Sequence, residues 1–373
     1  NISRVKIENK IYAFGGACNR YYNLHYNIDV DSDEYDFVKK RNYLMYEKYA
    51  PVHSADKKAL TIGLNKSLLT HNLFPLYYNF FTNLGCKIIV PDKLNEGALS
   101  RQTTSFCYPA QIAIMLFDNL VEKNPDYYFI PQVRELFVPF GNTKPDFCAT
   151  CIFSQGESFW MASLYRDKNL KNKILDPLLN FREGYEKEEK VFINIAKKLG
   201  FSASKAKKAF KIAVEVQREF EKECKLLGKK AIELIKSKED GFGFVLLGRP
   251  HNAFTEDANK GIPRKITTRG YVVIPYEMLD FEKEKLEEPF NSTMHWEIGQ
   301  KLLKSSQVIK KDKNLFFVYI TNFLCAIDSF LAQHARRVMG TKPSLTLELD
   351  GHTADAGINT RIDAYIDVIK NYI

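Results

Sequence analysis

A chain of 373 residues, 45% of them hydrophobic, is long enough for two domains and a substantial core. No apolar run reaches the about 18 residues of a membrane span, and no export signal is visible, so we expect a cytoplasmic protein without membrane contact. The net charge of +9 comes from lysines interspersed with glutamates, as in residues 186–190, which is typical of a solvated surface rather than a nucleic-acid interface. It also suits an anionic partner such as coenzyme A.

Seven cysteines in a chain without an export signal indicate a reducing compartment rather than a disulfide framework. We expect some to be core residues, such as Cys86 at a strand start, and others to be ligands. Cys224, on a charged helix, is expected to have no functional role. The chain begins with Asn1 rather than Met, which suggests a fragment of a longer protein or a processed chain.

The first half of the chain alternates between strands and helices after an irregular, tyrosine-rich segment (residues 1–55). Strands are predicted at residues 60–64, 87–91 and 127–131. Helices are predicted between them, at residues 68–84 and from Pro109 onward. Gly85 ends the first helix. This strand–helix–strand pattern is typical of a parallel sheet.

The second half repeats this pattern after a long, highly charged helical stretch (residues 181–236), which we interpret as an insertion or strut, with a coiled-coil partner site as the alternative. Strands are predicted at residues 244–248, 271–275, 315–320 and 344–349. Helices are predicted at residues 261–268, 295–309, 326–334 and 360–373. Gly248 and Gly270 have the same spacing as Gly63 and Gly85 in the first half, which supports two related lobes.

The sequence therefore predicts an α/β protein with two Rossmann-like lobes, parallel sheets and a long helical insertion. The expected parts are an irregular N-terminal segment (1–55), a first α/β lobe (56–175), the helical insertion (176–239) and a second α/β lobe (240–373). Ligands in such folds bind beyond the carboxyl ends of the strands.

Two cysteines directly precede predicted helices. Cys107 lies just before Pro109, which suits the first turn of a helix, and Cys325 separates the strand at 315–320 from the helix at 326–334. Free N–H groups and the helix dipole favour a thiolate at such positions. A third candidate lies in the loop that contains Cys148 and Cys151. Thiolates on such loops make a metal or iron–sulfur site if the fold brings them together.

The pair Cys148-x-x-Cys151 has three interpretations: a redox disulfide, a zinc half-site or part of a cluster site. Zinc usually requires a second pair or nearby histidines, and the chain has no second CxxC. Residues 152–156 lack a helical pattern, which argues against a thioredoxin-like motif. Thiolate ligands with few histidines favour iron–sulfur over zinc.

Four polar residues follow predicted strands, although the chain has no phosphate-binding loop and no dinucleotide glycine motif. Arg249 and His251 are candidates to bind an anion. The alternative is that they form an ion pair that stabilises the loop. Asp350 and His352 are candidates for acid–base work, with a capped turn as the alternative.

Several short segments together resemble one family. They are residues 105–110, the loop around Cys151, and residues 247–250, 323–328, 342–352 and 359–361. Their order and spacing resemble the 2-hydroxyacyl-CoA dehydratase-related proteins, in the branch known as acyl-CoA dehydratase activase-related. The resemblance runs from Leu60 to the C-terminus, apart from the helical insertion.

The resemblance implies an iron–sulfur cluster held between the two lobes by three cysteines, at positions that match Cys107, Cys151 and Cys325. Relatives carry either a [4Fe–4S] cluster with an open iron site or a double-cubane cluster shared between subunits, which implies a homodimer. They receive electrons from an ATP-hydrolysing activator that has its own cluster and is often fused upstream.

The chain departs from the family pattern at two of these cysteines. The family commonly has Pro after the second cysteine, whereas Ile152 follows Cys151 here. Either Cys148 or Cys151 could therefore be the second ligand. Ala326 replaces the Gly that commonly follows the third. Cys18, in a Gly-Gly turn, is a candidate fourth ligand, and its binding would close the open iron site and favour electron transfer over substrate chemistry.

The sequence thus predicts the iron–sulfur component of a 2-hydroxyacyl-CoA dehydratase-like system, with an acyl-CoA substrate, or of an ATP-dependent low-potential reductase system. Two alternatives remain. One is a non-catalytic α/β interaction module whose cysteines are structural. The other is a variant that binds zinc through Cys148 and Cys151.

Overall fold

The computed structural model describes residues 3–8, 10–14, 23–24, 29–52, 56, 58–102, 104, 106–138 and 148–373. The chain forms two compact units. Unit 1 comprises Asn1–Asn42, Cys224–Glu284 and Leu302–Ile373, and unit 2 comprises Tyr43–Glu223 and Lys285–Lys301. Three of the four sequence boundaries between the units fall within helices, namely α3 (Phe37–Tyr43), α9 (Ala203–Lys236) and α14 (Glu297–Lys311). The four-part division predicted from the sequence stays a prediction.

Unit 1 is built on a sheet of four parallel strands in the order β10-β9-β11-β12. The strands are β9 (Gly243–Leu247), β10 (Val273–Pro275), β11 (Leu315–Asn322) and β12 (Leu345–Leu349). All residues of the two central strands are buried, as expected for parallel strands that are covered on both faces.

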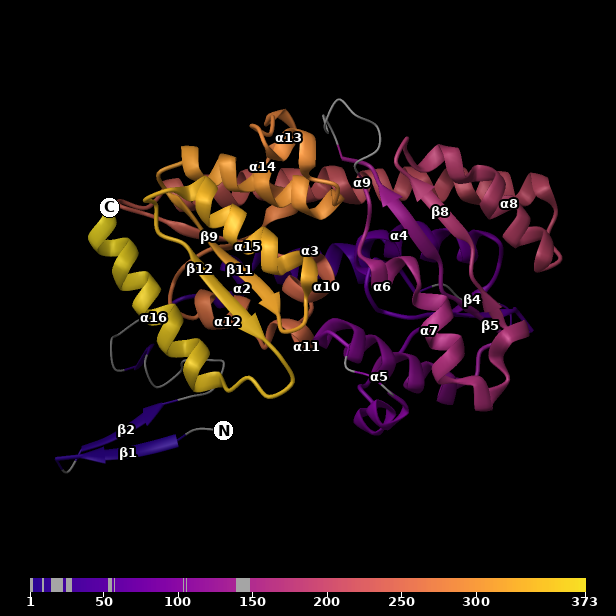
Figure 1. Ribbon diagram of the computed structural model, residues 1–373, viewed down its shortest axis with the longest axis horizontal. Coiled ribbons are helices and arrows are strands. Elements are labelled where there is room, and N and C mark those ends of the chain that lie inside the picture. Colours follow the sequence, from indigo (N-terminus) through magenta and orange to yellow (C-terminus); the bar gives the residue numbers. More distant parts are fainter. Residues whose placement is uncertain are drawn as a thin grey trace. The chain divides into compact units, whose positions relative to one another are not determined.

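Helices cover both faces of this sheet. They include α2 (Ser32–Tyr35), α3 (Phe37–Tyr43), α10 (Pro250–Ala253), α11 (Glu256–Asn259), α12 (Ile262–Thr267), α15 (Ala326–Met339) and α16 (Asp355–Tyr372), with 3-10 turns η6 (Tyr276–Met278) and η7 (Phe281–Lys283). In Figure 1, α14 and α15 lie on one side of the sheet, and α12 and α16 lie on the other. Ion pairs from Lys265 to Asp355 and from Arg269 to Asp363 join α12 and the turn after it to α16.

Unit 2 contains a second sheet of four parallel strands, in the order β4-β3-β5-β7. These are β3 (Thr61–Leu64), β4 (Lys87–Ile89), β5 (Tyr127–Phe129) and β7 (Ile174–Leu175). A smaller parallel pair consists of β6 (Gln132–Leu136) and β8 (Leu178–Phe181). In both four-stranded sheets the second strand along the chain is outermost and the first pairs with the third. This shared order confirms the predicted α/β fold with two Rossmann-like lobes.

The helical elements of unit 2 are η1, a π-helix (Leu44–Lys48), α4 (Thr70–Asn83), η2 (Glu96–Arg101), α5 (Tyr108–Lys123), α6 (Ile152–Gln155), α7 (Glu157–Leu164), η3 (Arg166–Lys168), η4 (Leu170–Asn172), η5 (Tyr185–Glu188), α8 (Glu189–Lys198) and α13 (Phe290–Thr293). Phe117 of α5, Tyr128 of β5 and Tyr165 after α7 belong to one buried core cluster. Phe80 of α4 packs its ring against Phe192 of α8. The predicted long helical stretch is present as α8 and α9.

The N-terminal part is more regular than the irregular segment expected for residues 1–55. It contains an antiparallel pair, β1 (Ser3–Ile7) and β2 (Lys10–Phe14), and the helices α2, α3 and η1. The many tyrosines and short apolar stretches gave no clear period here, so the pattern did not indicate these elements. None of the helices among the described residues is both long enough and apolar enough to cross a bilayer.

Gly248 lies where β9 ends, between β10 and β11 in the sheet, which is the point at which the strand order reverses. Its φ of 138° is rarely adopted by residues with a side chain. A Cβ atom at this position would lie 2.5 Å from the carbonyl oxygen of Ile320 in β11. Glycine therefore allows the chain after β9 to pass close to β11.

The first prediction concerns this close approach. Gly248→Ala should lower the free energy of unfolding by about 2 kcal/mol, because the new methyl group strains the backbone and clashes with Ile320. Urea-induced unfolding followed by circular dichroism measures this change. Gly97→Ala is the control, since a Cβ there meets no atom within 4 Å. Equal losses of stability in Gly248→Ala and Gly97→Ala would show that the close approach of Gly248 to β11 does not require glycine.

Candidate functional site

Cys107 is the N-cap residue of α5, and Pro109 occupies the first turn of that helix, as predicted from the sequence. The cysteine has extended backbone angles and a side chain that is only 3% exposed. Because α5 follows β4 and leads into β5, its start lies at the carboxyl edge of the unit 2 sheet. Cys107 thus stands where a Rossmann-like lobe binds its ligands.

Cys151 is also an N-cap residue, and here the structure corrects the sequence analysis. The residues after it form α6, a single helical turn that ends at Gly156. A four-residue helix with an aromatic and a β-branched residue has little intrinsic stability. Contacts from elsewhere in unit 2 hold it: the ring of Phe153 lies 5.3 Å from that of Phe106, and Trp160 Nε1 donates to the Phe153 carbonyl oxygen.

The same aromatic contacts connect the two cysteine-bearing segments of unit 2. Phe106 directly precedes Cys107, and its ring contacts both Phe153 and Trp160, which follow Cys151. Two helix starts that are far apart in the sequence are therefore packed together. Unlike Cys325, Cys151 makes no side-chain capping hydrogen bond to its helical turn.

Cys148 lies in a different environment, although it is only three residues away. The Cys148–Cys151 segment is extended at Ala149, which bridges Glu135 in β6 on one side and Trp296 on the other. Burial raises the pKa of the Cys148 thiol, and the carboxylates of Glu135 and Glu297 raise it further. This environment opposes formation of the thiolate that a metal needs.

Cys325 caps α15 with its sulfur. The Sγ atom accepts a hydrogen bond from the backbone N–H of Asp328, at 3.3 Å. This is one half of a capping box, with cysteine in the position usually occupied by Ser or Thr, whereas the Cys325 N–H donates to the Asn322 carbonyl oxygen. The strand, connector and helix predicted around Cys325 are therefore confirmed, and its sulfur faces the positive end of a helix dipole.

The side chain of Asp328 anchors the start of α15 to the sheet and to the loop after β9. Its carboxylate accepts hydrogen bonds from Arg249 Nη2, Tyr319 Oη and Thr321 Oγ1, at 3.0, 3.1 and 3.1 Å. Arg249 and Asp328 are both almost fully buried. Burial, together with this carboxylate, raises the pKa of Tyr319 well above its ordinary value. Arg249 thus forms the loop-stabilising ion pair that was the alternative to anion binding.

The other polar candidates of unit 1 have structural contacts. His251 is buried in α10, at the point where β9 ends. Asp350 accepts hydrogen bonds from the His352 N–H and from Thr353 Oγ1, and the bond from Thr353 contributes most to its lowered pKa. Asp350 therefore has the contacts of the capped turn, and the His352 side chain is exposed.

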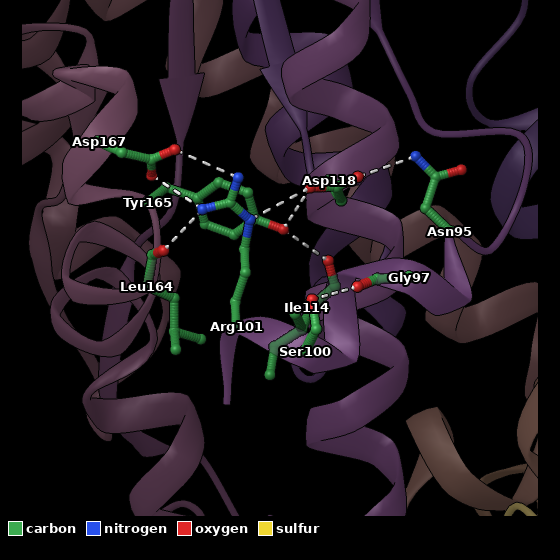
Figure 2. A network of polar contacts seen from close by, with 9 residues as sticks. All are labelled: Asn95, Gly97, Ser100, Arg101, Ile114, Asp118, Leu164, Tyr165 and Asp167. Carbon is green, nitrogen blue, oxygen red and sulfur yellow. Dashed lines mark hydrogen bonds and ion pairs between the residues drawn. The ribbon is translucent and has the colours of Figure 1, made fainter. Parts of the chain in front are cut away.

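A network of polar contacts surrounds Arg101, the last residue of η2 (Figure 2). The guanidinium donates to Asp167 and to the Leu164 carbonyl oxygen, and it lies over the ring of Tyr165 at 4.5 Å. Tyr165 Oη donates in turn to Asp118 of α5. The network joins η2, α5 and the end of α7, the elements that carry or flank the two cysteine segments of unit 2.

Glu157, the first residue of α7, is a site residue that the sequence analysis missed. Its side chain is 5% exposed. Ser67 Oγ and Asn65 Nδ2, both just after β3, donate to its Oε1 atom at 2.5 and 3.3 Å. Burial raises the pKa of this carboxyl to about 7. An acidic residue in the first turn of a helix is ordinary, and no local pattern indicates that this glutamate is buried.

The remaining cysteines are distributed as follows. Cys86 and Cys224 are buried, and burial raises the pKa of Cys86 to about 11, which is typical of a core thiol. Cys18 lies outside the described residues. In the part of the chain that the structure describes, no group of three or more His, Cys, Asp or Glu side chains could hold a metal ion. Cys107 and Cys151 belong to unit 2, and Cys325 belongs to unit 1.

Comparisons with known proteins give one family match. The family described as "CoA enzyme activase uncharacterised domain (DUF2229)" matches residues 61–279, more than half of the chain. A search of curated proteins finds no match. Among solved structures, the C-terminal domain of glucosamine-fructose-6-phosphate aminotransferase from Francisella tularensis is similar at 12% identity, over 91% of this chain and 98% of that chain, with a TM-score of 0.23. That likeness is too low to support an argument.

The second prediction tests the buried ion pair beside Cys325. Asp328→Ala should lower the free energy of unfolding by about 3–5 kcal/mol, because it removes the carboxylate that balances the charge of the buried Arg249 guanidinium. The double variant Arg249→Met/Asp328→Leu should cost clearly less than the single one. Urea titration measures both, and a double variant that is less stable than the single one would contradict this account.

The third prediction uses the raised pKa of Glu157. Because the folded protein holds this proton more tightly than the unfolded chain, the associated stability is fully present below pH 4.5 and is lost as pH rises through about 7. The loss should amount to about 3 kcal/mol. Glu157→Gln should therefore be more stable than wild type at pH 8, with the difference shrinking toward pH 5.

Unfolding free energies measured from pH 4.5 to 8 test this dependence. Glu96→Gln is the control, because Glu96 is exposed in the first turn of η2. A wild-type protein and a Glu157→Gln variant with parallel pH profiles would show that Glu157 is ionised at the same pH in both the folded and the unfolded chain.

Proposed function

Because this chain belongs to the family described as CoA enzyme activase uncharacterised domain (DUF2229), we propose that it is the iron–sulfur component of a system that activates a CoA-dependent enzyme. The proposal combines the family with the chemistry of three cysteines. Within this proposal, the chain acts in a 2-hydroxyacyl-CoA dehydratase-like system or in a low-potential reductase system, the two roles that the sequence motifs suggest.

One observation carries the proposal. Cys107, Cys151 and Cys325, the three positions that match the ligands of the resembling family, are each the N-cap residue of a helix. Random placement of cysteines would not put all three at helix starts. In α5 and α15, the free N–H groups and the dipole of a long helix stabilise a thiolate, which is the form that binds iron.

The structure supports a choice between the two cysteines of the CxxC pair. Cys148 has neighbouring carboxylates that disfavour its thiolate, whereas Cys151 caps a helical turn packed against the Cys107 segment. We therefore propose Cys107 and Cys151 as the iron ligands of unit 2, and Cys325 as the ligand of unit 1. The set contains only sulfur donors, which suits an iron–sulfur cluster better than zinc with histidine.

The residues around these thiolates have supporting roles in this proposal. Asp328, anchored by Arg249, presents its N–H to the Cys325 sulfur, and such hydrogen bonds to ligand sulfurs tune the potential of a cluster. The Arg101 network joins η2, which precedes Cys107 in the chain, to the end of α7. A bound cluster would supply one-electron transfer at low potential.

The proposed partners follow from the same premise. The electron donor is an activator that hydrolyses ATP and carries its own cluster, and the activated enzyme acts on a CoA thioester. The excess of positive charge, +9 over the chain, is compatible with an anionic partner of this kind. A homodimer would accommodate a cluster shared between subunits.

The fourth prediction tests the ligands. After anaerobic reconstitution with iron and sulfide, the wild-type protein should be brown and contain both elements, with an electron paramagnetic resonance signal on reduction. Cys107→Ala, Cys151→Ala and Cys325→Ser should each lose most of the iron. Serine at position 325 keeps an N-cap acceptor, so a loss in that variant reports the missing sulfur and not a frayed helix.

Cys224→Ala and Cys148→Ala are the matched controls and should retain wild-type iron content. A colourless wild-type protein, or wild-type iron content in the Cys107 and Cys325 variants, would overturn the proposal. Iron loss in Cys148→Ala with retention in Cys151→Ala would reverse the choice between these two residues.

A further inference from the structure

The hairpin formed by α8 and the first turns of α9 has two opposite faces. Its apolar face packs on α4, where the ring of Phe80 lies 4.8 Å from that of Phe192 in α8 and 6.5 Å from that of Phe210 in α9. Gln217 of α9 also accepts a hydrogen bond from the Leu76 N–H of α4. The apolar face is therefore covered within unit 2, and the opposite face is exposed to solvent.

The charged groups of this exposed face are all lysines. Residues 190–214 contain seven lysines and no Asp, Glu, Arg or His. In α8 the lysines are spaced i, i+7 and i+8, which places them on one side of the helix, and in α9 the others follow one another at intervals of three or four residues. All seven are exposed. Together they form the lysine face: Lys190, Lys197, Lys198, Lys205, Lys207, Lys208 and Lys211.

The lysine face carries most of the excess positive charge of the protein. Seven of the 54 Lys and Arg residues lie in residues 190–214, so the other 47 nearly balance the 45 Asp and Glu residues. The rest of α9 has a different pattern, because residues 215–236 contain six Lys or Arg residues and five glutamates. Several of these form ion pairs, as Arg218 does with Glu186. The excess charge is thus concentrated on one face of one hairpin.

The charges of the lysine face are hardly neutralised within the chain. Among the described residues, only one of its members has a carboxylate partner, since Lys207 Nζ lies 3.4 Å from Glu189. Lys205 Nζ instead donates to a backbone carbonyl oxygen of unit 2. Lysines three or four residues apart, such as Lys207 and Lys211, repel one another and disfavour the helix. An acidic surface placed against this face would relieve the repulsion.

The composition of the lysine face favours a protein partner over a nucleic acid. Arginine, which binds phosphate through two parallel hydrogen bonds, is absent from residues 190–214. The three aromatic rings of this fully described segment are buried or, like Phe201 beneath Lys205, half-buried, so none is exposed to stack on a base. Exposed lysines without an apolar anchor act mainly by steering an encounter between two molecules.

We propose that the lysine face is the docking surface for an acidic face of the CoA-dependent enzyme that this protein activates. The choice of partner rests on the proposed function, whereas the position and charge of the surface do not. A protein that activates an enzyme and then leaves must associate and dissociate rapidly, and complementary charges without an apolar anchor allow both. The whole surface lies within residues 61–279, the part of the chain that matches the family.

The fifth prediction compares two variants that each lose four positive charges from exposed lysines of the hairpin or of α9. The lysine-face variant is Lys197→Gln/Lys198→Gln/Lys208→Gln/Lys211→Gln. The matched control is Lys222→Gln/Lys229→Gln/Lys230→Gln/Lys236→Gln. Glutamine has nearly the helix propensity of lysine, so both variants should keep the wild-type circular dichroism spectrum.

The binding partner in this test is the 2-hydroxyacyl-CoA dehydratase of the same organism, immobilised for surface plasmon resonance. At low salt, the association rate should fall about tenfold or more in the lysine-face variant and change by less than about twofold in the control. High salt should slow the wild-type protein to the rate of the lysine-face variant, because it screens the charges. Equal association rates of the two variants would overturn the inference.

Cross-linking of the wild-type protein to the same enzyme identifies the surface without any substitution. A carbodiimide joins a lysine amine directly to a carboxylate that contacts it. Mass spectrometry of the product should therefore link the lysine face to Asp or Glu residues of the enzyme. Links that arise mainly from lysines elsewhere in the chain would overturn the inference even if a variant folds poorly.

The remaining outcomes separate this inference from other partners and from the proposed function. Wild-type binding that is stronger to a short DNA duplex or to phosphatidylserine vesicles than to the enzyme would overturn the inference in favour of a nucleic acid or a membrane. A protein that binds iron but not the enzyme would overturn this inference alone. A protein that binds no iron but docks through the lysine face would overturn only the cluster assignment, and one that binds neither would overturn both.

Discussion

All strands of the two four-stranded sheets run parallel within each sheet, and this constraint determines where the candidate site residues lie. A helix that connects two parallel strands must begin at the carboxyl edge of the sheet and return to the opposite edge. Cys107 and Cys325 stand at such helix starts, between β4 and β5 and between β11 and β12. The fold therefore delivers two thiols to the edges where α/β proteins bind ligands, without any long insertion to position them.

The two units stabilise these helix starts in different ways. In unit 1, a buried ion pair and two hydroxyl groups anchor Asp328, whose N–H meets the Cys325 sulfur. In unit 2, aromatic packing joins the Cys107 and Cys151 segments, and the Arg101 network ties the flanking elements together. In unit 1, the ion pair fixes the position of one sulfur through the Asp328 N–H. In unit 2, the aromatic contacts keep two separate segments of the chain packed together.

The sequence predicted the parts of this arrangement that depend on local signals. Pro109 marked the start of α5, and the apolar run before Cys325 marked β11. Glycines closed the helices before β4 and β10, where Gly85 and Gly270 both have positive φ. These signals act over a few residues, so they could be read without knowledge of the tertiary structure.

The parts that were missed depend on contacts between distant segments. α6 is too short to be stable alone and is held by Phe106, which lies in another segment of unit 2. Glu157 looks like an ordinary acidic residue at a helix start, and only its contact with Ser67, 90 residues away in the sequence, reveals that it is buried. The strands β6 and β8 have only five and four residues, too few to show a clear alternation of apolar and polar residues.

X-ray absorption at the iron edge of the anaerobically reconstituted protein tests the central claim most directly, because it identifies the atoms bound to iron. The account predicts a first shell of sulfur and a second shell that contains iron, with both signals lost together with most of the bound iron when Cys107 is replaced by alanine. A first shell of oxygen and nitrogen without neighbouring iron would contradict it.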